Sequence, residues 1–344
     1  MKTTIQKHQK HNLKIEMKTF KNIGLTLIAS ISIMSCSSDD TNAVPFELLP
    51  PSPSEFAAIR KNALDNLTQH FTVTAGTGVV TLTSDKGVII TIDTDCLTKN
   101  GVAATGIVDI DFVELFDKGS MLTTNKPTMG LLPNGDKNML ISGGEFFIEA
   151  TQNGVALETG CNINLTVPSG LTGGIDNTMT FWEGITTDEE NLVWDEVEFG
   201  TGPQGGGMVG FEGTNYQVTF GNFGWSNVDR FYNDPRPKTS LLASVPNGYD
   251  NNNCAIYLSY DGEGGDNLAK LDTYNPTTKK FSEHYGQLPI GLQCHVIFAT
   301  EESGQWRYAI KAVTVAAGDE YNFTLSETTV GTEAQLVAAI NALP

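Results

Sequence analysis

Residues 106–115 read GIVDIDFVEL, an alternation of apolar and polar residues that is typical of a β-strand. Successive side chains of a strand point to opposite faces. One face would therefore carry Val108, Ile110, Phe112 and Glu114, and the other Ile107, Asp109, Asp111 and Val113. The first face is apolar and the second is mixed, as in an antiparallel sheet with one solvated side. The stretch predicts a sheet that packs on a core by one face.

Strand patterns of this kind recur along the chain, separated by turn signals rich in glycine and asparagine. Examples before residue 235 are GVVTLTS, GVIITIDTD, GGEFFIEATQNG and NINLTVP, and examples after it are CAIYLSY, GLQCHVIFAT, WRYAIKAVTV and YNFTLSE. With 35 glycines in 344 residues and few long helical patterns, the chain is predicted to be all-β. Its length favours two antiparallel β-sandwich domains, over residues 54–235 and 236–344. The glycine-rich residues 201–214 are expected to form a long loop.

Two short helices are expected at the ends of this all-β region. Ser52, Pro53 and Glu55 supply an N-cap, a proline at the first helical position and a capping box. Thr332 and Gln335 are a second capping pair, and apolar residues at helical spacing follow each start. We expect both helices to dock on the sheets.

The N-terminus has the features of an exported lipoprotein. A lysine-rich flank precedes the apolar run 23–34, which is too short to span a bilayer, where about 20 residues are needed. Ile33-Met34-Ser35-Cys36 resembles the lipobox of bacterial lipoproteins, whose cysteine is acylated. Residues 1–35 are therefore predicted to be a signal peptide, with Met17 as an alternative start, and residues 36–53 a tether. Acylation of Cys36 with more than one chain would anchor the protein stably to a membrane.

Four polar residues follow the predicted acylation site. Ser37, Ser38, Asp39 and Asp40 resemble the signal that sends Bacteroidota-type lipoproteins to the outer face of the outer membrane. The alternative is a solvated linker on a lipoprotein that faces the periplasm. We therefore expect an outer-membrane, lipid-anchored protein that faces the cell exterior.

Several segments resemble a known family when taken together. GVIITID, GIVDIDFVELFDKGSMLTTNKPTMGLLPNG, LISGGEFFIEATQNGVAL, INLTVP and MTFWEG followed by LVWDEV resemble a family of Bacteroidota envelope lipoproteins of unassigned activity. The N-terminal half, which ends with FGWSNVDRFYND, is similar to ZU5-type β-sandwich domains. Residues 288–325 are similar to the closing strands of transthyretin-like, carboxypeptidase-regulatory-type modules. The resemblance implies a non-catalytic binding or scaffolding module.

The charge of the mature chain limits its partners. Removing residues 1–35 takes away six lysines and one glutamate, which leaves 15 basic and 39 acidic residues and a formal charge of −24. Such a chain is not expected to bind nucleic acid or to present a face to anionic lipid. The acidity favours solubility, with Ca²⁺ as the only cofactor that it suggests. Asp261, Glu263 and Asp266 in DGEGGD are the candidate Ca²⁺ ligands, with a plain hairpin loop as the alternative.

Four cysteines remain after acylation, and an even number in an exported chain is compatible with two disulfides. Three pairings are possible, of which Cys96 with Cys161 and Cys254 with Cys294 would keep each bridge inside one domain. A zinc site made of Cys254, His284, Cys294 and His295 is the alternative, although the spacing is not that of a zinc motif.

Motifs for catalysis are absent from the sequence. It contains no GxSxG and no HExxH, and the residues after position 35 include only three histidines. Acid pairs such as Asp93 with Asp95 and Asp109 with Asp111 leave a carboxylate hydrolase as a weaker alternative. Glycan capture for a polysaccharide-uptake system is another alternative to a binding or scaffolding module, with Trp194 and Trp306 as candidate sugar platforms.

Overall fold

The strand predicted at GIVDIDFVEL is β6, Gly106–Leu115, in a computed structural model that describes residues 49–344 apart from 187–191, 202–204 and 263–265. Val108, Ile110 and Phe112 are buried, while Ile107 is 63% exposed. The predicted alternation holds as far as Phe112. Beyond it both faces are buried, because helices cover the second face of this end of the strand.

The largest sheet has eight strands and contains β6. Along the order β1-β6-β8-β16-β12-β13-β7, with β9 beside β8, the strands are Gln69–Ala75, Gly106–Leu115, Lys137–Gln152, Gly224–Phe231, Thr180–Thr186, Leu192–Glu196, Met129–Leu131 and Val155–Ala156. The long strand β8 also pairs with β7, so β8, β16, β12, β13 and β7 close into a ring.

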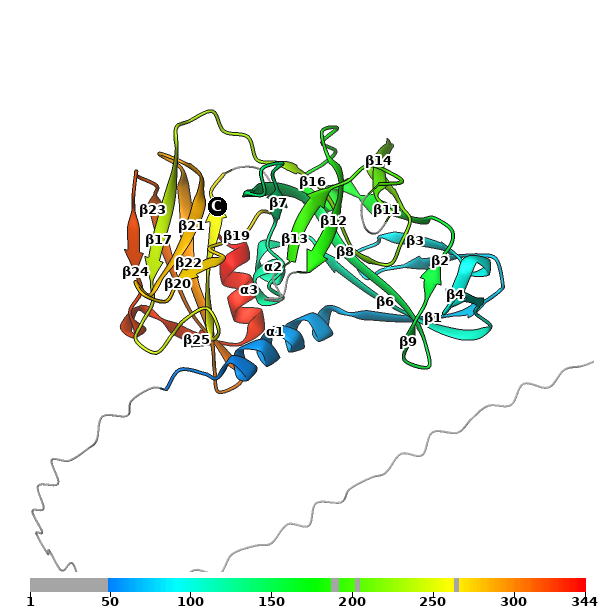
Figure 1. Cartoon of the computed structure of the whole chain (residues 1–344), viewed down its shortest axis with the longest axis horizontal. Coiled ribbons are helices and arrows are strands. Elements are labelled where there is room, and N and C mark those ends of the chain that lie inside the picture. Colours follow the sequence, from blue (N-terminus) through cyan, green and yellow to red (C-terminus); the bar gives the residue numbers. More distant parts are fainter. Residues whose placement is uncertain (1–48, 187–191, 202–204, 263–265) are drawn as a thin grey trace, which may run out of the picture. The chain divides into compact units, whose positions relative to one another are not determined.

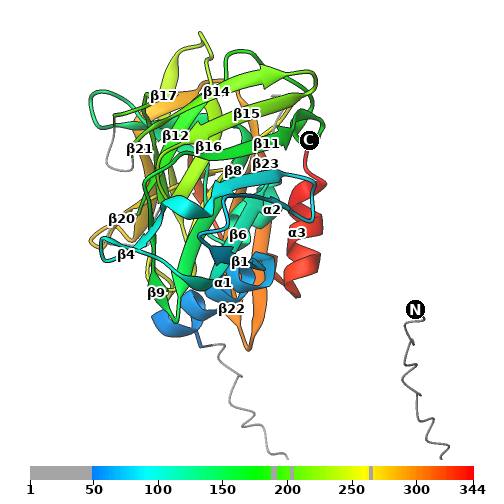
Figure 2. The same ribbon diagram turned by 90° about the vertical axis from the view of Figure 1, so that its right-hand side faces the viewer.

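A five-stranded sheet packs on the first sheet and completes the N-terminal sandwich (Figure 2). Its order is β14-β15-β11-β3-β2, with bounds Gly207–Glu212, Asn215–Phe220, Ile163–Pro168, Ile89–Asp93 and Val79–Thr83. A small sheet of β10, β4 and β5 lies at Glu158–Thr159, Leu97–Lys99 and Val102–Ala103. The interior between the two large sheets contains residues such as Ile90, Ile110 and Phe220.

Strand β14 corrects the prediction of a long loop over residues 201–214. Residues 207–212 form a hairpin with β15. The glycine at 207 is required there because a Cβ would lie 2.7 Å from the ring of Phe181. Glycine-rich sequence here allows close packing and a tight turn at Gly213, where φ is +60°.

The C-terminal part also consists of two sheets. One has the order β20-β21-β17-β24, with bounds Thr273–Asn275, Lys280–Pro289, Lys238–Ser244 and Glu320–Asn322. The other has the order β19-β18-β22-β23-β25, with bounds Ala269–Lys270, Cys254–Tyr260, Gln293–Glu302, Gln305–Thr314 and Thr329–Gly331. All pairings are antiparallel except β7 with β13 and β17 with β24, among the described strands.

Three helices lie where the two parts meet (Figure 1). They are α1 (Pro53–Leu67), α2 (Lys118–Thr123) and α3 (Glu333–Asn341), and short 3₁₀ turns occur at Thr94–Cys96, Ser169–Thr172 and Leu325–Glu327. Both predicted capping boxes are present, at Ser52 with Glu55 and at Thr332 with Gln335. Among the described residues, no helix is long and apolar enough to cross a membrane.

A second hydrophobic cluster surrounds these helices and joins the two parts. It combines Phe56 of α1, Met121 of α2 and Leu336 of α3 with Trp182 of the ring and Tyr257 of β18. The predicted boundary at residue 235 falls in the connection between β16 and β17. The two groups of sheets nevertheless belong to one compact unit, Leu48–Pro344, because they share this core.

Candidate functional site

Several predicted site residues lie outside the described part of the chain. The described part begins at residue 49, after Cys36 and the export residues Ser37, Ser38, Asp39 and Asp40. Glu263 belongs to residues 263–265, which are also outside it. The lipidation and export assignments therefore stay predictions.

The two predicted disulfides have different outcomes. Cys96 and Cys161 are bonded, with Cα atoms 5.6 Å apart. The predicted bridge between Cys254 and Cys294 is wrong: both thiols are free and buried. In the register of β18 and β22, Cys254 pairs with Thr300 and Cys294 with Tyr260. The two cysteines thus lie six residues apart along the strands, roughly 20 Å at about 3.3 Å per residue.

The same register is incompatible with the alternative zinc site. Cys294 faces the sandwich interior with Val296, whereas His295 points to the opposite face of β22. Neighbouring residues on one strand cannot bind one ion from opposite faces.

The tryptophans predicted as sugar platforms are both inside the molecule. Trp194 is 0% exposed, and its indole N–H donates to the carbonyl of Pro127 at 3.1 Å. Trp306 is 1% exposed and packs edge-on against Phe56 of α1, with ring centroids 6.4 Å apart. Neither ring can stack on a ligand, so this assignment is wrong.

The acids predicted as ligands or catalysts mostly support local structure. Asp93 accepts from the backbone N–H of Asp95 at 3.1 Å, and Asp95 accepts from that of Gly78 at 3.0 Å. Asp109 is exposed on β6, and Asp111 on the same face lies 2.7 Å from His70 Nδ1. Asp93, Asp95 and Asp111 thus each have a local hydrogen-bond partner, and the carboxylate hydrolase stays an untested alternative.

Asp261 and Asp266, the described members of the predicted Ca²⁺ set, have separate partners. Asp261 Oδ1 lies 2.8 Å from His295 Nδ1, and the Asp266 carboxylate accepts from the backbone N–H of Lys118. The Ca²⁺ site stays a prediction because Glu263 is not described. A serine also lies near this His295–Asp261 pair, because Ser259 is opposite His295 in the strand register. Ser259 is 0% exposed, so Ser259, His295 and Asp261 do not form an accessible nucleophilic site.

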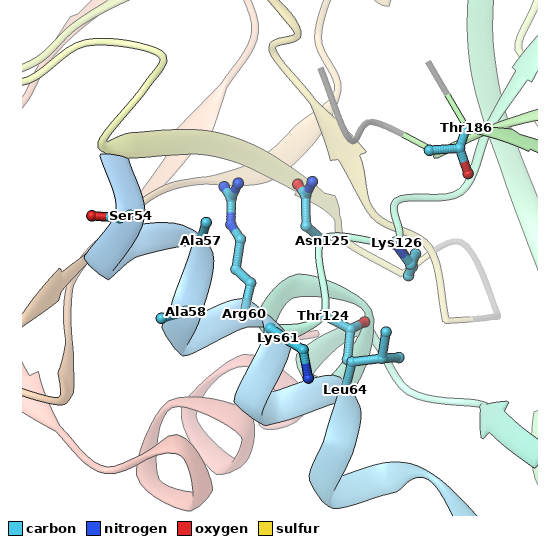
Figure 3. A pocket seen from close by; sticks show the side chains of 10 residues that line it. All are labelled: Ser54, Ala57, Ala58, Arg60, Lys61, Leu64, Thr124, Asn125, Lys126 and Thr186. Atoms are coloured by element: carbon cyan, nitrogen blue, oxygen red, sulfur yellow. The ribbon is translucent and has the colours of Figure 1, made fainter. Parts of the chain in front are cut away.

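A pocket of about 460 Å³ lies between α1 and the segment that follows α2 (Figure 3). Its volume is in the range of small-molecule sites. One wall is α1 and the other is the segment 124–126. The lining residues are Ser54, Ala57, Ala58, Arg60, Lys61, Leu64, Thr124, Asn125, Lys126 and Thr186.

Helix α1 presents the first wall because its apolar face is held against the core. Phe56, Ile59 and Ala63 are buried, so the residues at the edge of that face, such as Ala57 and Leu64, line the pocket. The capping box at Ser52 fixes the start of the helix, where the Ser52 backbone N–H donates to Glu55 at 2.7 Å.

The second wall begins where α2 ends. The Thr124 hydroxyl donates to the carbonyl of Ser120 at 2.8 Å, and Asn125 follows with φ at +56°, in the left-handed region that asparagine tolerates better than most residues. The Tyr257 hydroxyl, from β18, donates to Asn125 Oδ1 at 2.8 Å. The C-terminal part of the chain thus helps to hold this wall in place.

The pocket is locally basic in a strongly acidic chain. Arg60, Lys61 and Lys126 line it, and none of the described lining residues is an aspartate or glutamate. Three of the 15 basic residues that follow position 35 therefore meet at one site. Such a site attracts anions, because like-signed groups in a concave surface focus the electrostatic field.

Arg60 is held in place by its neighbours. Its guanidinium carbon lies 3.8 Å from the centroid of the Phe56 ring, and Nη2 donates to the Tyr257 hydroxyl at 3.4 Å. The Nε atom is sealed from solvent and has no hydrogen-bond partner in the described part of the chain. Lys126 is also placed by an aromatic ring, with Nζ 5.2 Å from the centroid of Trp225.

Two buried acids lie behind Lys126. Glu145 and Asp229 are both 0% exposed, and neither Glu145 carboxyl oxygen has a hydrogen-bond partner among the described residues. Burial, and then the nearby Asp229, raise the pKa of Glu145 well above its usual value, with Lys126 acting in the opposite direction.

No protein-family model matches the chain, and neither the curated proteins nor the solved structures contain a significant match.

The pocket residues were missed in the sequence analysis. The available signal was the pair Arg60-Lys61 on an amphipathic helix of an acidic chain. Lys126 could not be joined to it, because the contact between α1 and the segment 124–126 depends on tertiary packing.

Proposed function

We propose that this chain is a lipid-anchored envelope lipoprotein whose pocket beside α1 binds an anionic ligand without chemical conversion. The observation that carries the proposal is the gathering of Arg60, Lys61 and Lys126 around one pocket, whose described lining residues include no acid. Anchoring rests on the sequence around Cys36. A surface location would let the pocket meet ligands from outside the cell.

The binding part of the proposal is tested with the full chain in detergent micelles. Trigalacturonate and a sulfated heparin tetrasaccharide serve as anionic probes, and maltotriose as a neutral one, in calorimetric titrations at low and high salt. The anionic probes are expected to bind more tightly than maltotriose, and their affinity to fall as salt screens the charges. Equal affinity for all three probes at both salt concentrations would contradict the proposal.

Lys126→Gln tests whether the pocket is responsible, and Lys279→Gln is its matched control. Lys279 is an exposed lysine in the connection between β20 and β21, outside the pocket. Losing one ion pair of up to about 1 kcal/mol should lower the affinity of the first variant roughly two- to fivefold. The control should bind like the wild type.

The anchoring part is tested in cells. Cys36→Ala should abolish acylation and membrane retention, and normal membrane fractionation of this variant would refute the lipoprotein assignment. Replacing Asp39 and Asp40 with alanine should reduce degradation by protease added to intact cells while leaving membrane attachment unchanged. Unchanged exposure would leave these residues as a simple tether.

A further inference from the structure

The three cations of the pocket do not point at one place. Arg60 and Lys61 are neighbours on α1, and successive helical residues project about 100° apart, since a turn has 3.6 residues. Figure 3 shows the Arg60 side chain beside Asn125, with Lys126 beyond it, while Lys61 extends in another direction, toward Leu64. The pocket therefore has two positively charged ends.

The end formed by Arg60 and Lys126 is rigid. The Tyr257 hydroxyl lies 3.4 Å from Arg60 Nη2 and 2.8 Å from Asn125 Oδ1, which ties the arginine to the segment that carries Lys126. Phe56 and Trp225 support the two cationic groups. A preorganised pair of this kind binds an anionic group without first losing side-chain entropy.

The end formed by Lys61 is open. The Lys61 side chain is 71% exposed, and its one ion pair within the described residues is with Asp65, at 2.5 Å and four residues along the same helix. Exposed pairs of this spacing contribute about 0.3–0.5 kcal/mol. Lys61 can therefore exchange Asp65 for a ligand anion at little cost.

The wall between the two ends is apolar. It includes Ala57, Ala58 and Leu64, and Ser54 and Thr186 are also lining residues. The described lining residues include no aromatic ring on which a nucleic acid base could stack. The wall formed by α1 is a helix, so it offers no strand edge to an extended peptide. Small apolar side chains beside hydroxyl and amide groups suit the body of a sugar ring.

We propose that the ligand is a segment of an acidic polysaccharide, with one anionic group at the Arg60–Lys126 end and a second near Lys61. This inference rests on the proposed function and specifies its ligand. A single compact anion reaches only one end, and the volume of about 460 Å³ exceeds what such an ion fills. A repeating acidic sugar supplies both the spacing and the uncharged body between the charges.

The test compares ligand lengths in the wild-type full chain and in Lys61→Gln. Galacturonate, trigalacturonate and inorganic phosphate are titrated at low salt, with tetra-aspartate as an acidic peptide. Because Lys61 is exposed, its replacement leaves the fold intact, and Lys279→Gln controls for general charge. We expect trigalacturonate to bind at least about tenfold more tightly than galacturonate. We also expect Lys61→Gln to weaken only the trimer, roughly two- to fivefold.

Three other results of these titrations would overturn the inference. Equal affinities for galacturonate, phosphate and the trimer, with no effect of Lys61→Gln, would overturn the polysaccharide inference and leave the anion pocket standing. Tighter binding of tetra-aspartate than of trigalacturonate would replace the sugar with an acidic peptide. No binding of any anion would overturn both the inference and the proposed function.

Discussion

Tyr257 and Asn125 join the two parts of the chain at the pocket. The buried Tyr257 hydroxyl, on β18, donates to Asn125 Oδ1 at 2.8 Å, 132 residues away in sequence, and also accepts from Arg60 at 3.4 Å. One phenol group from the C-terminal part thus positions both walls of a pocket built by the N-terminal part.

Tyr257→Phe should therefore affect stability and binding together. Losing the hydrogen bond to Asn125 should lower the free energy of unfolding by about 1 kcal/mol, as measured by urea titration. The affinity for an anionic probe should also fall, because Arg60 and Asn125 lose their common partner. A variant that unfolds earlier but binds normally would show that this contact is only structural.

Glu145→Gln should change how stability depends on pH. Burial raises the pKa of Glu145 in the folded state, so the proton is held more tightly there than in the unfolded chain. The stability that this proton gives is complete below the unfolded pKa of about 4.3 and is lost as pH rises through the folded pKa. Glutamine does not titrate, so the variant should gain stability relative to the wild type with increasing pH. The same difference in unfolding free energy between variant and wild type at pH 4 and at pH 8 would contradict this expectation.

Glu283 provides a second case with a defined pH range. It is buried, and burial raises its pKa to about 7, although the backbone N–H groups of Gly286 and Gln287 each donate to it at 3.2 Å. The contribution of the protonated Glu283 side chain to the free energy of unfolding should be lost between about pH 4.5 and pH 7, by about 3 kcal/mol. Subtracting the unfolding free energies of Glu283→Gln from those of the wild type across this range isolates the effect. A flat difference would show that Glu283 ionises normally.

Much of the fold can be predicted from the local sequence pattern. The apolar face of Val108, Ile110 and Phe112 and the capping boxes at Ser52 and Thr332 are confirmed, because a strand's period and a helix cap depend on neighbouring residues only. The pattern fails from Val113 to Leu115, where helices from distant parts of the chain cover the outer face.

The incorrect site predictions have the same cause. Trp306 is covered by Phe56, which lies 250 positions earlier, and sequence patterning cannot bring the two together. Cys254 and Cys294 are separated by the register of β18 and β22, which composition does not reveal. Gly130 is also explained only by the fold, because a Cβ there would lie 2.7 Å from Leu140 and 2.9 Å from the ring of Trp182.

Reduction of the disulfide is expected to destabilise the protein strongly. The bridge between Cys96 and Cys161 closes a loop with a sequence separation of 65, for which the chain-entropy model gives about 4 kcal/mol. The double variant Cys96→Ser, Cys161→Ser should unfold at a lower urea concentration and no longer respond to reductant. Cys254→Ala keeps the bridge and should stay as sensitive to reductant as the wild type. Equal stability with and without reductant would show that the loop is already ordered in the unfolded state.

The most direct measurement of the central claim is methyl NMR of the full chain in micelles during titration with trigalacturonate. The account predicts saturable shifts of the Ala57, Ala58 and Leu64 methyl resonances, which disappear at high salt and are reduced in Lys126→Gln. Saturable shifts confined to residues outside the pocket, or no shift at any residue, would contradict it.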